Sequence, residues 1–315
     1  MRPGASAALS ARRKTEWPTI GLIIVCHCSI VASAALMEHA WPLAFPVLVA
    51  SLTLYSSLQH EVLHGHPFAN RHLNHLLVFP AWGLFVPYLR FQATHLAHHR
   101  DANLTDPYDD PESWYLAQRD WARTSWPRQL LLRVNNTLAG RLALGPAISL
   151  WAFAARDLAA IRRGDRAIRS AWLVHAGAVV LAAGLLRATG TTPVSAYLLA
   201  AYLGMSVLMV RTFAEHQAHV SSRGRSVIIE SRGLFALLFL NNNLHAVHHA
   251  APDLPWYALP ARYHARRAHY AMLNRGYVLA GYGELFRRYA FRAKEPVPHP
   301  FVEGERDLAH RGHEA

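Results

Sequence analysis

The sequence contains few cysteines and few charged residues. Only Cys26 and Cys28 are cysteines, and both lie in an apolar run. Two cysteines at this spacing exclude a disulfide framework and a four-thiolate metal site, so we interpret both as packing residues. Charged residues make up 17% of the chain, against about 25% in average soluble domains, while hydrophobic residues make up 52%. The composition is therefore unusually apolar for a soluble protein.

Long apolar runs account for much of this composition. The first run, Thr19 to Met37, has His27 as its only strongly polar residue and is long enough to span a bilayer. A cleaved signal peptide is the competing interpretation, because the small residues "ASA" lie near the end of the run. Further strong runs cover residues 41–58, 171–186 and 193–213.

Two other segments are apolar but are not expected to cross the membrane. Residues 76–91 form a short run interrupted by Pro80 and Pro87, which indicates a re-entrant or interfacial hairpin. Residues 138–160 mix small and apolar residues with scattered arginines, which favours a helix lying in the interface. Four membrane spans therefore remain.

Basic residues orient these spans. The formal net charge is +12, and the cluster Arg12, Arg13 and Lys14 places the N-terminus in the cytoplasm by the positive-inside rule. The basic loop 161–169 is then cytoplasmic too, and the two outer loops contain almost no Lys or Arg. This topology explains the basic charge without nucleic-acid binding, for which the sequence has no motif.

The expected fold is therefore an all-α integral membrane protein with about four transmembrane helices, interfacial helices and a cytoplasmic histidine-rich cap. We expect a disordered basic tail over residues 1–16, a membrane domain over 17–290 and a polar C-terminal tail over 291–315. Both termini would lie in the cytoplasm, and the membrane would be a bacterial plasma membrane.

The chain has 21 histidines, and three clusters of them fall on the cytoplasmic side in this topology. Three boxes have regular spacing, and "RTFAEHQAH" adds His216 just after the last long run. The boxes are His60-x3-His64, His95-x2-His98-His99 and His245-x2-His248-His249. On a helix, residues three and four apart share a face, so each box can aim two or three imidazoles at one metal centre. A catalytic zinc needs only three protein ligands, whereas eight or nine imidazoles fit two metals of higher coordination number.

Two other classes of metal protein compete with a two-metal enzyme. His60-Glu61-x-x-His64 matches the zinc-protease pattern, with Glu61 as general base, but a second intramembrane motif such as "LDG" is absent. A metal transporter would carry its ligands near the middle of the spans, not at their ends. His27 and His175, alone in apolar segments, are interpreted as structural. We leave His66, His72, His75 and His219 without a role.

This box pattern resembles the membrane fatty acid desaturase superfamily, which also includes carotenoid ketolases and hydroxylases. The resemblance extends over about residues 40–262 and includes "HHAAPDLPWYALP" after the third box. Box one departs from the family's common form, because Glu61 replaces an Asp, although Gly65 follows His64 as it often does there. The resemblance implies a di-iron centre that uses O2. Its implied ligands are His60, His64, His95, His98, His99, His216, His245, His248 and His249.

The implied activity is lipid desaturation, with a di-iron lipid hydroxylase or carotenoid ketolase or hydroxylase as the alternative on the same scaffold. Metal-bound histidines usually donate their second N–H to a carboxylate or a carbonyl group. Nearby residues that could accept such bonds are Glu61, Asp101, Asp106, Glu215 and Asp253, with Asn241 to Asn243 as further polar neighbours. Capping is an equally good explanation for the asparagines.

The electrons for such chemistry must come from another protein. The sequence has no flavin or nicotinamide fingerprint, no C-x-x-C pair and no haem-binding "HPGG". The expected partners are therefore a lipid or fatty acyl substrate, membrane lipids, and a separate donor such as ferredoxin or cytochrome b5 with its reductase. A basic cytoplasmic face would suit an acidic donor.

Overall fold

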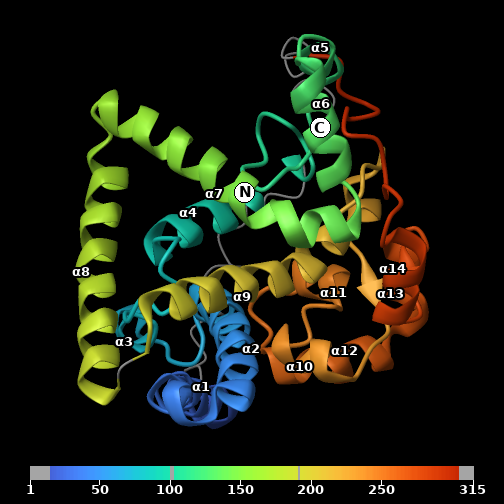
Figure 1. The fold of residues 1–315 in the computed structure, drawn as a ribbon. Coiled ribbons are helices and arrows are strands. Elements are labelled where there is room, and N and C mark those ends of the chain that lie inside the picture. The colour runs from blue at the N-terminus through green and yellow to red at the C-terminus, as the bar shows by residue number, and fades with distance from the viewer. Residues whose placement is uncertain (1–14, 100–102, 191, 305–315) are drawn as a thin grey trace, which may run out of the picture.

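The computed structural model describes residues 15–99, 103–190 and 192–304, and most of this part of the chain is helical, with almost no sheet (Figure 1). Residues 1–14 of the expected basic tail, and Asp101, lie outside it. Five helices are long and apolar enough to cross a membrane. They are α1 (Trp17–Ala35), α2 (Met37–Leu63), α7 (Leu138–Arg162), α8 (Arg166–Thr189) and α9 (Val194–Glu215).

The path of the chain restricts which of the five can cross. His98 and His216 lie before and after α7 to α9, yet their Nε2 atoms are 2.9 Å apart, so an even number of helices crosses between them. The link from α8 to α9 meets the link from α1 to α2, where the Thr192 hydroxyl donates to the Ala34 carbonyl oxygen at 2.6 Å. These contacts fit the expectation that α8 and α9 cross as a pair and that α7 lies on the side of the histidines as an interfacial helix.

Close packing of α2 along α9 holds the ends of both helices at one place. Gly204 of α9 faces α2, and a Cβ added there would lie 3.2 Å from the Cβ of Leu52. The Thr53 hydroxyl also donates to the Gly204 carbonyl at 3.2 Å. Small residues at such a contact let membrane helices approach closely. The C-terminal ends of both helices are therefore brought together, and these ends carry His60, His64 and His216.

The segment between α3 (Arg71–Leu77) and α4 (Tyr88–His98) is irregular and lies among the long helices. Its backbone oxygens accept bonds from side chains of those helices. The Tyr55 hydroxyl shares its hydrogen between Val78 and Pro80, at 2.8 and 2.6 Å. The other bonds are Tyr197 to Trp82 at 3.0 Å, His175 to Leu84 at 2.8 Å and His27 to Leu77 at 2.8 Å. Irregular backbone at membrane depth requires such partners, and they give His27 and His175 the structural role expected of them.

Short elements build the rest of the cap. On one side lie α5 (Gln118–Ala122) and α6 (Trp126–Asn135), seen at the top of Figure 1. The chain after α9 forms short elements that gather at the right of that view. They are η2 (Ser222–Arg225), β1 (Ile228–Ile229), α10 (Leu234–Leu238), α11 (His245–Ala250), η3 (Trp256–Ala258), α12 (Leu259–Ala265), α13 (Arg267–Leu273), β2 (Val278–Leu279) and α14 (Tyr282–Tyr289).

Two backbone pairings tie this cap together. Strands β1 and β2 pair in parallel, with Ile228 opposite Val278. Residues 291–304, part of the segment expected to be a polar tail, run back along the body. There the Leu116 N–H donates to Val297, and the His299 N–H donates to Leu116.

Candidate metal centre

The first two histidines stand in the last turn of α2. His60 and His64 are four residues apart and therefore share one face of the helix. Gly65 follows with φ of 96°, a left-handed conformation that glycine adopts without steric cost and that commonly ends a helix. The helix thus stops immediately after its second histidine.

Helix α4 supplies the second box in its last turn. His95 and His98 belong to the helix, and His99 caps its C-terminus. His95 and His99 point to one side, and their Nε2 atoms are 3.0 Å apart. His98 lies about 100° around the helix from His99 and points to another group.

The third box is held by three asparagines. Asn241 has φ of 56° and its side chain donates to the Trp256 carbonyl at 3.0 Å. Asn243 donates to Ile229, the second residue of β1, at 2.6 Å. Between them, Asn242 donates to Glu215 at 3.1 Å. These contacts fix the start of α11, and with it the direction of its histidines.

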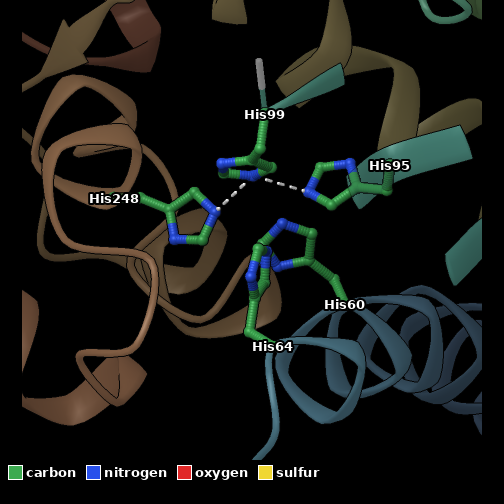
Figure 2. A group of neighbouring side chains, drawn as sticks. All are labelled: His60, His64, His95, His99 and His248. Carbon is green, nitrogen blue, oxygen red and sulfur yellow. Dashed lines mark hydrogen bonds between the residues drawn. The ribbon is translucent and has the colours of Figure 1, made fainter. Parts of the chain in front are cut away.

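The structure brings all nine histidines of the implied ligand set into two adjoining groups. The five-histidine group, shown in Figure 2, combines α2, α4 and α11 and contains His60, His64, His95, His99 and His248. The four-histidine group contains His98, His216, His245 and His249. Boxes two and three contribute to both groups, and the stacked rings of His99 and His249, 4.2 Å apart, connect them.

The outer nitrogens of three imidazoles face polar acceptors. His95 Nδ1 lies 3.1 Å from Glu112, and His98 Nδ1 lies 2.8 Å from Asp110. His245 Nδ1 lies 3.0 Å from Asn242 Oδ1. A neutral imidazole that donates from Nδ1 keeps a lone pair on Nε2. All three Nε2 lone pairs therefore point into the histidine groups.

The distances between facing Nε2 atoms fit a metal shell. Two nitrogens about 2.1 Å from a metal and at right angles lie about 3.0 Å apart. The observed Nε2–Nε2 distances are 2.9 Å for His98–His216, 3.0 Å for His216–His245, 3.0 Å for His95–His99, 3.1 Å for His245–His249 and 3.2 Å for His99–His248. Moreover, His60 Nε2 is buried and has no hydrogen-bond partner among the described residues. Lone pairs gathered in this way fit a bound cation at the centre of each group.

Protonation within the cluster is uneven. At His95 and His248, burial first and neighbouring imidazoles second hold the pKa well below 6.5. Burial also lowers the pKa of His98, but Glu112 and the hydrogen bond to Asp110 outweigh it and raise the pKa to about 9. A metal-bound imidazole is neutral, so a cation that binds at His98 displaces its extra proton.

The carboxylates chosen from the sequence lie in different surroundings. Glu215 is near the site, 3.6 Å from His245 Nδ1 and 2.7 Å from Arg211. Glu61 accepts from the Trp256 N–H at 2.9 Å, Asp106 accepts from backbone N–H groups of its own turn, and Asp253 is exposed. Asp101 lies outside the described residues.

Sequence reasoning missed Asp110 and Glu112, which contact the second box directly. Both belong to "DPYDDPE", an acidic run that begins seven residues after His99. That run is the signal that could have found them. The spacing alone could not have identified Asp110 and Glu112, because the turn at residues 105–112 decides which carboxylate faces a histidine.

Four histidines that had no role lie outside both groups. His66 bridges towards carboxylates, with Nδ1 2.7 Å from Glu16 and Nε2 4.0 Å from Glu61, and so ties the start of α1 to the loop after box one. His72 is exposed on α3. His75 Nε2 lies 3.4 Å from the Gln92 side chain, and His219 Nδ1 accepts from the Ser221 N–H at 3.0 Å.

The sequence is similar to known proteins over most of its length. A protein-family model described as "Fatty acid desaturase" matches residues 39–280, which include all nine clustered histidines. A fatty acid desaturase of Bacillus subtilis (strain 168) is 24% identical over 276 residues, covering 82% of this chain and 76% of the relative. Because the family model covers most of the sequence, the chain belongs to the fatty acid desaturase family.

Proposed function

We propose that the protein is an O2-dependent di-iron desaturase that introduces a double bond into the acyl chain of a lipid. The observation that carries this proposal is the division of nine histidines into a group of five and a group of four, each with inward-facing nitrogens. Imidazole ligands suit iron, and two irons with O2 and two electrons supply an oxidant for unactivated C–H bonds that no side chain can provide. The balanced reaction also takes up two protons and releases two waters.

The chain's own residues hold and orient this centre. Asp110 and Glu112 accept hydrogen bonds from His98 and His95, and Asn242 accepts from His245. Such partners fix the ring orientation and make the inner nitrogen a better ligand. Burial of His95, His98 and His245, each 3% exposed or less, keeps bulk water away from the reacting atoms.

A cavity beside the site offers room for part of the lipid substrate. It has a volume of about 130 Å³ and lies between α2, the segment before α4, α4 and α8. Its walls are mostly apolar, with Tyr88 on α4 and Ala178 on α8. Tyr88 stands seven residues before His95, about 10 Å along the helix. We infer that an acyl chain reaching the histidines runs through this cavity.

A zinc protease is a weaker explanation of the same residues. His60 and His64 belong to a group of five imidazoles, whereas a catalytic zinc keeps three protein ligands and one open position. Replacing Glu61 by Gln would abolish a zinc protease by removing its general base. A desaturase should keep a substantial part of its activity in this variant.

The decisive experiment combines metal and lipid measurements on the purified protein and on cells that express it with an electron donor. We expect about two irons per chain and a lipid product two mass units lighter than its precursor. A product sixteen mass units heavier would indicate the hydroxylase alternative instead, and stoichiometric zinc in active protein would contradict the proposal. His98→Ala should abolish the product, whereas the control His72→Ala, at an exposed histidine outside both groups, should not.

A further inference from the structure

The electrons that the proposed desaturation consumes must enter near the histidine groups, because electron transfer slows steeply with distance. One approach, over α5 and the loop before it, is acidic. Asp109 is exposed there, Glu112 and Asp120 are partly exposed, and Asp106 and Asp110 are buried. An acidic carrier protein would be repelled there.

Helices α12 and α13 form a basic surface. Residues 259–275 contain Arg262, Arg266, Arg267 and Arg275 and no acidic residue. All four arginines are exposed. Arg267 pairs with Glu230 at 2.6 Å, so the other three dominate the positive potential of this face, which we call the α12–α13 face.

A buried cluster of side chains connects the α12–α13 face with the helix of the third histidine box. Tyr263 and Tyr270 are the inward residues of these helices, 2% and 3% exposed. They pack in one buried cluster with Ala246 and Val247, which lie between His245 and His248 on α11. On the outside, Arg262 donates to the Tyr270 hydroxyl at 3.2 Å. A carrier seated on these arginines would thus lie next to α11, which contributes histidines to both groups.

The remaining exposed residues of the face also suit a protein partner. Met272 is 69% exposed on α13, and His264 and His269 are exposed beside it. Protein interfaces are enriched in arginine, methionine and aromatic residues and depleted in lysine. The α12–α13 face contains no lysine.

We propose that the α12–α13 face is the docking site of a small acidic one-electron carrier protein. This inference rests on the proposed function, because it assigns the entry point for the two electrons of that reaction. The carrier is oxidised by one electron at each encounter, and two encounters supply one turnover. The arginines steer and orient the carrier, and the shell of Tyr263, Tyr270 and Val247 is the path to the histidines.

The test uses the full-length iron-loaded enzyme with an acidic [2Fe–2S] ferredoxin and its NADPH-dependent reductase as the probe. R262E/R266E reverses the charge of the face. R162E/R163E makes the same charge change in the exposed connection between α7 and α8 and is the matched control. R262Q/R266Q is a milder version in case the reversal disturbs folding, and iron content reports that each variant is intact.

We expect R262E/R266E to raise the KM for ferredoxin at least tenfold at low salt, with a smaller effect of the Gln variant and none of the control. The difference in KM between R262E/R266E and the wild type should become smaller at high salt, because salt screens the electrostatic attraction that steers ferredoxin to the face. Product formed in a single turnover driven by dithionite should remain within about twofold of the wild type, since that reductant needs no docking site.

Three results would overturn the docking proposal. The first is an unchanged KM for ferredoxin in both α12–α13 variants, and the second is an equal change in the control. The third is a loss of activity in R262E/R266E that depends on the anionic-lipid content of the vesicles carrying the enzyme and not on the ferredoxin concentration. That result would show that the face contacts the membrane. Failure of the proposed function is distinct from all three, because wild-type enzyme would then form no desaturated product even with dithionite.

Discussion

At the scale of single residues, the centre depends on the groups that orient its histidines. Asp110 is the most strongly engaged of them. One of its oxygens lies 2.8 Å from His98 Nδ1 and accepts from the Glu112 N–H, and the other accepts from the Thr105 N–H at 2.9 Å. Both oxygens are therefore used, and Glu112 and Asp110 together raise the pKa of His98.

Replacing Asp110 by Asn should weaken metal binding about 10- to 100-fold. The amide loses the negative charge, and its NH2 group must face one of the N–H donors that a carboxylate oxygen accepted. Competition with a chromogenic chelator measures the affinity. Asp109→Asn is the control, because the Asp109 side chain is exposed. Equal affinities in the two variants would show that Asp110 does not orient a ligand.

At the scale of elements, the irregular segment before α4 depends on donors from the long helices. Tyr55→Phe removes the hydroxyl shared by the carbonyls of Val78 and Pro80. We expect a loss of about 1–3 kcal/mol in the free energy of unfolding, because buried carbonyl groups lose their partner. Thermal unfolding in detergent measures it. Tyr202→Phe, which removes a bond to Ala143 nearer the surface, should cost less.

The cavity beside α4 should set the length of the acyl chain that the enzyme accepts. Ala178→Phe adds a large side chain to its α8 wall and should shift the products towards shorter chains or a different double-bond position. Ala176→Phe on the same helix is exposed and should leave the product profile unchanged. Lipid mass spectrometry of expressing cells gives the comparison. Identical profiles in the two variants would place the substrate elsewhere.

At the scale of the whole molecule, the histidines and the α7–α8 connection should lie on one side of the membrane. Arg163→Cys and Val194→Cys, each in a C26A/C28A background, place single thiols in the connection before α8 and at the start of α9. We expect an impermeant thiol reagent to label Arg163→Cys from the cytoplasmic side and Val194→Cys from the other side. Labelling of both from the same side would refute the crossing of α8.

The sequence by itself determined the class of fold, and its histidine boxes pointed to the residues that gather in the two groups. Run length predicted α1, α2, α8 and α9 as spans, and the scattered arginines and small residues of α7 predicted an interfacial helix. Helical spacing of the boxes predicted convergence on a metal centre, because i, i+3 and i+4 positions share a face whatever the tertiary structure.

Only the tertiary structure decided how the nine histidines divide and which groups orient them. His98 and His99 are neighbours in the chain yet serve different groups, because successive helical residues point about 100° apart. Asp110 reaches His98 through a turn and Asn242 reaches His245 through a left-handed bend, neither of which spacing predicts. Periodicity determines a face along one element, but the atoms that meet across elements depend on how those elements pack.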